Sequence, residues 1–191
     1  SRCLRRRYFW QNETAGVYVT ALLALSCGWG GNRREGRQKG DIMKITVTPD
    51  TFKLAQVFTI SRGSRTEAKV LTVRVEKGGV TGWGECVPYA RYNETLESVT
   101  AEIAGLPAAF TRQELQDLLP AGAARNAVDC ALWDLEAKQA GKRVWELAGL
   151  EAPGAEITAY TLSLASPEEM QRQAAENAHR PLLKIKLGTP D

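Results

Sequence analysis

Two lysines separated by a single residue, Lys184 and Lys186, are the feature of the sequence with the clearest chemical meaning. They stand in the run LLKIKL, whose alternation is typical of a β-strand, so both side chains face the same side. A lysine amine can act as an acid or a base in proton transfer, and a second ammonium group beside it is a ready electrostatic partner. The spacing therefore indicates proton transfer, although a solvent-exposed strand is the commoner source of such a pattern when it stands alone.

The strand of the two lysines (182–187) closes a strand–helix–strand pattern. Residues 157–164 form the first expected strand, and a helix with Ser166 as its N-cap follows. A helical crossover between two strands predicts that they pair in parallel. In a parallel barrel, catalytic groups gather at the carboxyl ends of the strands, which is where the two lysines stand. The chain stops soon afterwards, so we expect it to end in the middle of a domain.

The region before this pattern begins with the period-two alternation of antiparallel strands. Gly78 and Gly79 are typical of a tight hairpin turn, and a turn-rich loop is expected at 61–65. These signals predict a three-stranded antiparallel meander with one buried face. Its runs are 44–48 with 52–60, then 68–76, then 80–85.

Helical spacing replaces the alternation after Pro88. Thr111 and Glu114 have the spacing of a capping box at the start of one helix. The strongest helix is expected over 121–140, and its small and apolar residues form one stripe that allows a neighbour to pack closely. The stripe contains Ala124, Val128, Ala131, Leu132 and Leu135.

The first 42 residues differ from the rest in charge. They hold eight basic and three acidic residues, a net charge of +5, whereas the whole chain has +3, which leaves −2 for the remainder. Three interpretations stay open for them: a signal peptide, a disordered basic tail, or upstream sequence translated ahead of a start at Met43. We therefore divide the chain into an extension (1–42), an α+β domain (43–155) and the start of a β/α barrel (156–191).

Composition excludes several classes of protein. The basic residues lie outside the expected folded part, which argues against a nucleic-acid-binding domain. The apolar run 17–27 is too short to span a bilayer, which needs about 20 residues in a helix. The four cysteines lack metal-ligand spacing and are interpreted as reduced thiols of a cytoplasmic protein. The single histidine, His179, leaves little room for a histidine-based zinc site or a serine-type triad.

Longer stretches of the sequence resemble a known family. The order of a meander, a helical segment and a barrel start with Lys-x-Lys in its second strand is similar to the enolase superfamily, and in particular to its dipeptide epimerases. The resemblance implies an α+β capping domain followed by the first strands of a truncated TIM-like barrel. The matching stretches are ISRGSRTEA (60–68), GWGECVPYARY (82–92), LPAGAARNAVDCALWDL (119–135), ITAYT (157–161) and LKIKL (183–187).

The resemblance also implies a reaction, namely removal of the proton next to a carboxylate and its return on the opposite face. A bound Mg²⁺ would stabilise the charge that develops. Lys186 would be one acid/base and Lys184 its electrostatic partner. The second base and the metal ligands would lie on later barrel strands, so no metal ligand is expected within these 191 residues.

The implied substrate is a small dipeptide, L-Ala-D-Glu from peptidoglycan, epimerised to L-Ala-L-Glu. Arg65 is the first candidate to pair with its distal carboxylate in bidentate fashion, with Arg62 second. Thr161 could hydrogen-bond the dipeptide backbone, and Glu85 is rejected as a metal ligand because the resemblance places the metal in the barrel.

Several alternatives stay open at this point. A muconate-type cycloisomerase or an o-succinylbenzoate synthase would share the same chemistry, and a catalytically inactive truncated fragment belongs to a different class. We expect the 191-residue chain alone to be inactive. A homo-oligomer is one open arrangement of the full-length protein.

Overall fold

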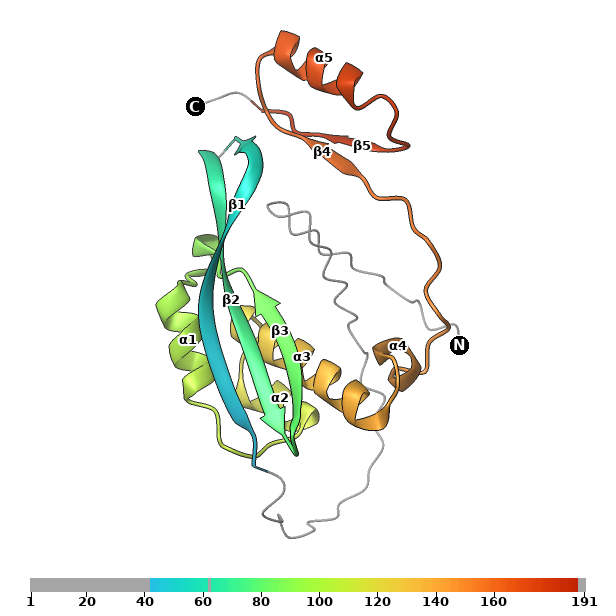
Figure 1. Ribbon diagram of the computed structural model, residues 1–191. Coiled ribbons are helices and arrows are strands. Elements are labelled where there is room, and N and C mark those ends of the chain that lie inside the picture. Colours follow the sequence, from blue (N-terminus) through green and yellow to red (C-terminus); the bar gives the residue numbers. More distant parts are fainter. Residues whose placement is uncertain (1–41, 62, 189–191) are drawn as a thin grey trace, which may run out of the picture. The chain divides into compact units, whose positions relative to one another are not determined.

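The computed structural model describes residues 42–61 and 63–188, which form two compact units (Figure 1). The first unit holds residues 42–50 and 69–152, and the second holds 51–61, 63–68 and 153–188. The expected extension lies outside the described residues except for its last residue, Ile42. No helix within the described part of the chain is long and apolar enough to cross a membrane.

The predicted meander is present as a three-stranded sheet in the order β1 (Lys44–Ile60), β2 (Gly63–Lys77) and β3 (Val80–Cys86). β2 and β3 are antiparallel, with Lys77 opposite Val80 at the turn. Gly78 and Gly79 make this turn with φ of 60° and 77°, the left-handed region that a two-residue hairpin of this kind requires.

The expected loop at 61–65 is shorter than predicted, because β1 runs to Ile60 and β2 already begins at Gly63. Arg65 therefore lies in a strand and not in a loop. The residues from Gly63 to Glu67 are all exposed, so neither face of this end of the hairpin carries the apolar alternation by which a strand is recognised.

Within the first unit, four α-helices follow the sheet along the chain. The predicted capping box is present at α2: the Thr111 hydroxyl accepts the N–H of Glu114 at 3.1 Å, and the Glu114 carboxylate accepts the N–H of Thr111 at 2.7 Å. The start of α3 is held differently, since Glu94 accepts the N–H of Ala123 at 2.7 Å and that of Tyr89 at 3.0 Å. The helices are α1 (Leu96–Ala104), α2 (Arg112–Leu118), α3 (Ala123–Ala140) and α4 (Val144–Leu147).

α3 packs on the sheet through its predicted stripe, all of which is buried. The approach to β3 is very close. A Cβ atom added at Gly82 would lie 2.0 Å from the carbonyl oxygen of Ala131, and one at Gly84 would lie 2.0 Å from that of Ala127. The small residues of the helix and the two glycines of the strand thus permit a backbone-to-backbone contact.

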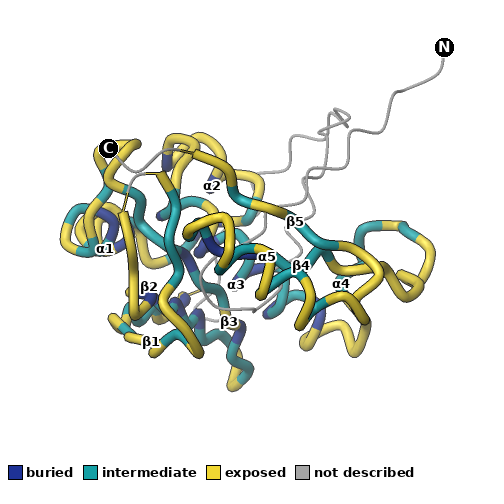
Figure 2. Tube along the Cα trace, turned by 90° about the horizontal axis from the view of Figure 1, so that it is seen from above, coloured by how far each residue is buried: buried dark blue, intermediate teal, exposed yellow. Residues whose placement is uncertain are grey.

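One hydrophobic core joins the sheet and the helices of the first unit. In Figure 2 its buried segments are drawn in dark blue. Cys86 and Cys130 are free thiols in or beside this core, as the interpretation of the cysteines predicted for these two. The largest fully buried side chains here are Leu71, Val73, Val75, Val99, Ile103, Leu115, Val128 and Leu135.

The second unit contains the predicted strand–helix–strand pattern as β4 (Tyr160–Leu162), α5 (Pro167–Glu176) and β5 (Leu183–Ile185). Ser166 caps the helix, since its hydroxyl accepts the N–H of Glu169 at 3.3 Å. The two strands pair in parallel, as predicted, but each is only three residues long. The strands are shorter than predicted, because the composition of one segment does not show how far it stays paired with another.

Candidate functional site

The register of the parallel pair brings two of the predicted site residues onto one face, and a third follows directly after the pair. Thr161 stands directly opposite Lys184, and residues opposite each other in a parallel pair project to the same side. Lys186 lies two residues further on, and its N–H donates to the carbonyl oxygen of Leu162 at 3.3 Å, one residue beyond the end of β5. Strand alternation predicts the same face for Lys186, which stands one residue beyond the end of β5.

The positions along the strands differ slightly from the prediction. Thr161 and Lys184 are the middle residues of β4 and β5, whereas Lys186 follows the last residue of β5. All three side chains are half-buried. Of the predicted group, Lys186 therefore lies at the carboxyl end, where a substrate could approach it.

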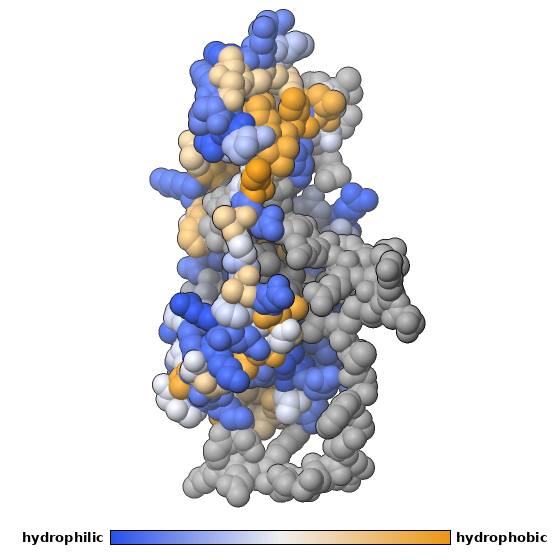
Figure 3. All heavy atoms as spheres, turned by 90° about the vertical axis from the view of Figure 1, so that its right-hand side faces the viewer, coloured by the Kyte–Doolittle hydropathy of each residue, from blue (hydrophilic) through white to orange (hydrophobic). Residues whose placement is uncertain are grey.

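The opposite face of the pair is apolar. Leu162 is buried, while Ile185 is 52% exposed. Apolar surface is visible on this part of the molecule in Figure 3. The exposed large apolar side chains between residues 153 and 188 are those of Ile157, Leu182, Ile185 and Leu187.

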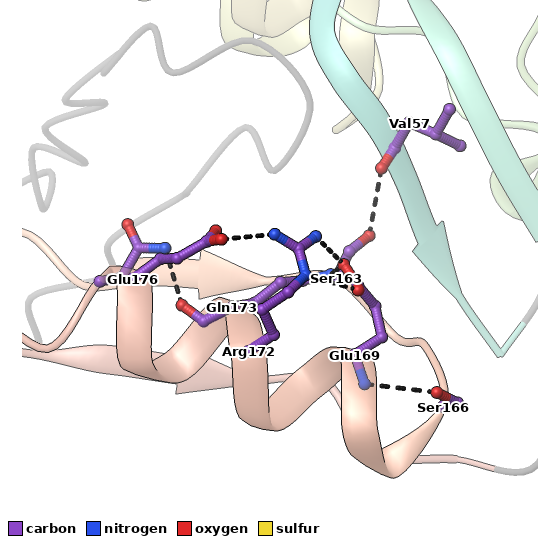
Figure 4. A network of polar contacts seen from close by, with 8 residues as sticks. Val57, Ser163, Ser166, Glu169, Arg172, Gln173 and Glu176 are labelled. Carbon is purple, nitrogen blue, oxygen red and sulfur yellow. Dashed lines mark hydrogen bonds and ion pairs between the residues drawn. The ribbon is translucent and has the colours of Figure 1, made fainter.

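The β1–β2 hairpin reaches the carboxyl end of β4 within the second unit. The buried hydroxyl of Ser163 accepts the N–H of Thr59 at 2.6 Å, and the N–H of Leu164 donates to the carbonyl oxygen of Thr59 at 3.0 Å. Figure 4 shows Ser163 directed from the segment after β4 toward Val57 on β1, whose carbonyl oxygen lies 3.4 Å from the hydroxyl. Sequence reasoning missed this contact, although a serine within an apolar strand pattern was a visible signal.

The same hairpin also approaches the segment after β5. A Cβ atom added at Gly188 would lie 3.1 Å from the Cβ of Ser61. Across the hairpin, the hydroxyls of Thr59 and Ser64 are 2.9 Å apart, and Arg65 is the next residue. Arg65 is exposed, and Arg62, the second arginine candidate, lies outside the described residues. The end of the hairpin that carries Arg65 and the segment that carries the two lysines thus belong to one compact unit.

An exposed ion-pair network covers α5 (Figure 4). Arg172 pairs with Glu169 and Glu176, one turn away on either side. The hydrogen bonds from Arg172 and Gln173 lower the pKa of Glu169 to about 2. Ion pairs between residues three and four positions apart stabilise an isolated helix, so this network supports α5. We assign it no role in substrate binding.

Oxygen ligands for a metal are not gathered in this part of the chain. Among residues 42–61 and 63–188, no group of three or more His, Cys, Asp or Glu side chains could hold a metal ion. The pKa of Glu85 is raised, first by burial and then by the nearby charge of Asp50. A Mg²⁺ ion therefore does not fit the described residues as its ligand set.

Comparison with known proteins identifies the family to which this fold belongs. Residues 42–149, more than half of the chain, match the family described as mandelate racemase / muconate lactonizing enzyme, N-terminal domain. The chain belongs to this family of the enolase superfamily. The predicted meander with helices is the N-terminal capping domain of that family, and the resemblance drawn from the sequence motifs is confirmed.

Dipeptide epimerases are among the relatives that this chain resembles. The L-Ala-D/L-Glu epimerase of Escherichia coli (strain K12) is 44% identical over 149 residues, which are 75% of this chain and 46% of that protein. The chain thus spans about half the length of this curated relative.

Two solved structures of the superfamily contain dipeptides. An enolase family member from Agrobacterium tumefaciens, with homology to dipeptide epimerases and with sodium and L-Ala-L-Glu bound, has a TM-score of 0.74 and 53% identity over 78% of this chain and 47% of its own. A dipeptide epimerase from Methylococcus capsulatus, complexed with Mg and L-Arg-D-Lys, has a TM-score of 0.68 and 30% identity over 77% and 46%.

Proposed function

We propose that this chain is the N-terminal portion of a dipeptide epimerase that interconverts L-Ala-D-Glu and L-Ala-L-Glu, a step in the use of peptidoglycan peptides. The observation that carries the proposal is the position of Thr161 opposite Lys184, with Lys186 two residues further on, in a chain with epimerase relatives. The hairpin of Arg65 in the same unit supports an acidic substrate.

Each of these residues has a distinct role in the proposal. Lys186, at the carboxyl end of β5, exchanges a proton with the α-carbon of the second amino acid. The ammonium of Lys184 faces the adjoining carboxylate and stabilises the negative charge that develops there. Thr161 hydrogen-bonds the dipeptide backbone, and Arg65 pairs with the distal carboxylate of glutamate, with Arg62 as the second candidate.

The remaining parts of the reaction belong to other residues. Epimerisation by two bases needs a second base on the opposite face of the α-carbon. We propose that this base, together with the acidic ligands of Mg²⁺, comes from a portion that the relatives have and the described residues do not contain. The ion would supply electrostatic stabilisation of the developing charge, and this chain would supply the first base and the recognition of the distal carboxylate. The parallel pair would then be the start of the barrel.

The test uses the 191-residue chain joined at its carboxyl end to the part of the E. coli epimerase that follows the matched segment. In D₂O with Mg²⁺ and L-Ala-D-Glu, NMR should show loss of the glutamate α-proton signal and formation of the L,L-dipeptide. Lys186→Ala and Lys184→Ala should each slow this exchange by about 10²–10⁴-fold, the usual contribution of a positioned acid or base.

Lys142→Ala provides a matched control, because Lys142 is an exposed lysine of the first unit. Its exchange rate should equal that of the unchanged joined protein, and the 191-residue chain alone gives the background. A joined protein that folds and binds Mg²⁺, yet exchanges neither L-Ala-D-Glu nor any other Ala-Xaa dipeptide, would contradict the proposal.

A further inference from the structure

The outer edge of β1 is partly closed by the segment that follows β4. β1 is an edge strand in the order β1-β2-β3, so its outward N–H and C=O groups have no partner within the sheet. At Thr59 both groups are paired by two consecutive residues: the N–H with the hydroxyl of Ser163, and the C=O with the N–H of Leu164. The hairpin is thereby attached to the parallel pair at one backbone position.

A serine side chain is suited to this attachment. Ser163 is only 6% exposed, and a hydroxyl can accept the N–H of Thr59 while it donates its own proton. The carbonyl oxygens of Val57 and Thr59, at 3.4 and 3.5 Å, are the acceptors within reach. An alanine here would remove the acceptor and leave a partly buried N–H without its partner.

The contact between Ser163 and Thr59 is close to Arg65, which binds the distal carboxylate of the substrate in our proposal. The hydroxyl of Thr59 is 2.9 Å from that of Ser64, and Arg65 follows directly. Ser163 itself stands two residues after Thr161 and immediately beyond β4. The contacts of Ser163 with Thr59 and of Thr59 with Ser64 therefore connect the carboxyl end of β4 with the residue before Arg65.

We infer that Ser163 is a positioning residue that fixes the β1–β2 hairpin at the carboxyl end of β4 and thereby holds Arg65 in place for the distal carboxylate of the substrate. This inference rests on the proposed function for the role of Arg65, but the attachment itself does not. In this role Ser163 acts through Arg65, so its effect is expected on substrate preference and not on proton transfer.

The first experiment measures the attachment in the 191-residue chain without any activity. In Ser163→Ala, the amide of Thr59 should exchange with D₂O at least about tenfold faster than in the unchanged chain. Ser166→Ala is the matched control, because Ser166 also accepts a backbone N–H in the same unit but from Glu169 on α5. There the amide of Glu169 should exchange faster and that of Thr59 should not. Equal protection of Thr59 in Ser163→Ala and the unchanged chain would overturn the inference.

The second experiment measures the preference in the joined protein with L-Ala-D-Glu and its neutral isostere L-Ala-D-Gln. Ser163→Ala should lower the kcat/KM ratio of the acidic over the neutral dipeptide by about tenfold, through KM, with kcat changed less than about twofold. Arg65→Ala should lower it at least as much, and the double variant should equal Arg65→Ala alone.

The outcomes separate the inference from the proposed function. No exchange in the unchanged joined protein would count against the function alone. An active joined protein whose preference is the same in Ser163→Ala and Ser166→Ala would overturn the inference and leave the function standing. An additive loss in the double variant would also overturn it, because Ser163 would then act independently of Arg65.

Discussion

Substitution of Gly82 by alanine tests the closest contact of the fold. The new Cβ would lie 2.0 Å from the carbonyl oxygen of Ala131, and 2.7 Å from both the N and the Cβ of Leu135. Carbon and oxygen normally approach to no less than about 3.3 Å, so the first contact overlaps by about 1.3 Å. Two of the three obstructing atoms belong to the backbone of α3, and no side-chain rotation can remove them.

The overlap can be relieved only if α3 moves away from β3 by roughly 1 Å. A gap of that size forfeits a quarter to a half of the dispersion energy of each contact it opens. The contacts affected are those of fully buried residues such as Ala127 and Ala131. Overpacking usually costs about 1–3 kcal/mol, and we place Gly82→Ala at about 3 kcal/mol or more because backbone atoms obstruct it.

The assay is urea unfolding of the 191-residue chain, followed by far-UV circular dichroism and tryptophan fluorescence. Gly105→Ala is the control: its Cβ would lie 3.5 Å from the nearest atom, its φ is −77°, and its stability should stay within about 0.5 kcal/mol of the unchanged chain. If Gly82→Ala also unfolds within 0.5 kcal/mol of the unchanged chain and with the same slope, the close approach of α3 to β3 is wrong.

Three further predictions concern the first unit. Glu94→Ala should lower the free energy of unfolding by about 2 kcal/mol in the same urea assay, because it removes the carboxylate that accepts the N–H groups of Tyr89 and Ala123. Glu94→Gln keeps one acceptor oxygen and should lower it less. Burial raises the pKa of the Cys86 thiol to about 12, so peptide mapping after iodoacetamide treatment at pH 8 should find it alkylated at least about a hundredfold more slowly in the folded chain than in urea. Because the thiol ionises at lower pH in the unfolded chain, its contribution to the free energy of unfolding is complete below the ordinary pKa of 9.0 and is lost as pH rises toward 12. In Cys86→Ala, the free energy of unfolding should therefore fall less steeply over this pH range.

The elements that the sequence predicted well are those with local causes. The capping box of Thr111 and Glu114 involves residues three apart, and the turn at Gly78 and Gly79 depends on two adjacent φ angles. The buried stripe of α3 follows from helical spacing alone. Each of these signals is contained in a short stretch of sequence, so it can be recognised without knowledge of the rest of the fold.

The candidate site was predictable only in part, for the same reason. Alternation placed Lys184 and Lys186 on one face, but the position of Thr161 opposite Lys184 depends on the register between two strands far apart in the sequence. The attachment of Thr59 by Ser163 joins residues 104 positions apart. Nothing local to either residue specifies the other, so only the three-dimensional structure shows the pair.

The β1–β2 hairpin has two differently stabilised parts. Near β3, β2 alternates buried residues such as Val73 and Val75, which are locked into the core under α3. From Gly63 to Glu67 no residue is buried, so apolar packing does not fix this end and its position depends on polar contacts such as those of Ser163. Stability and substrate preference should therefore separate: Gly82→Ala should lower the urea midpoint of the first unit, whereas Ser163→Ala should change the preference for an acidic dipeptide with little effect on that midpoint.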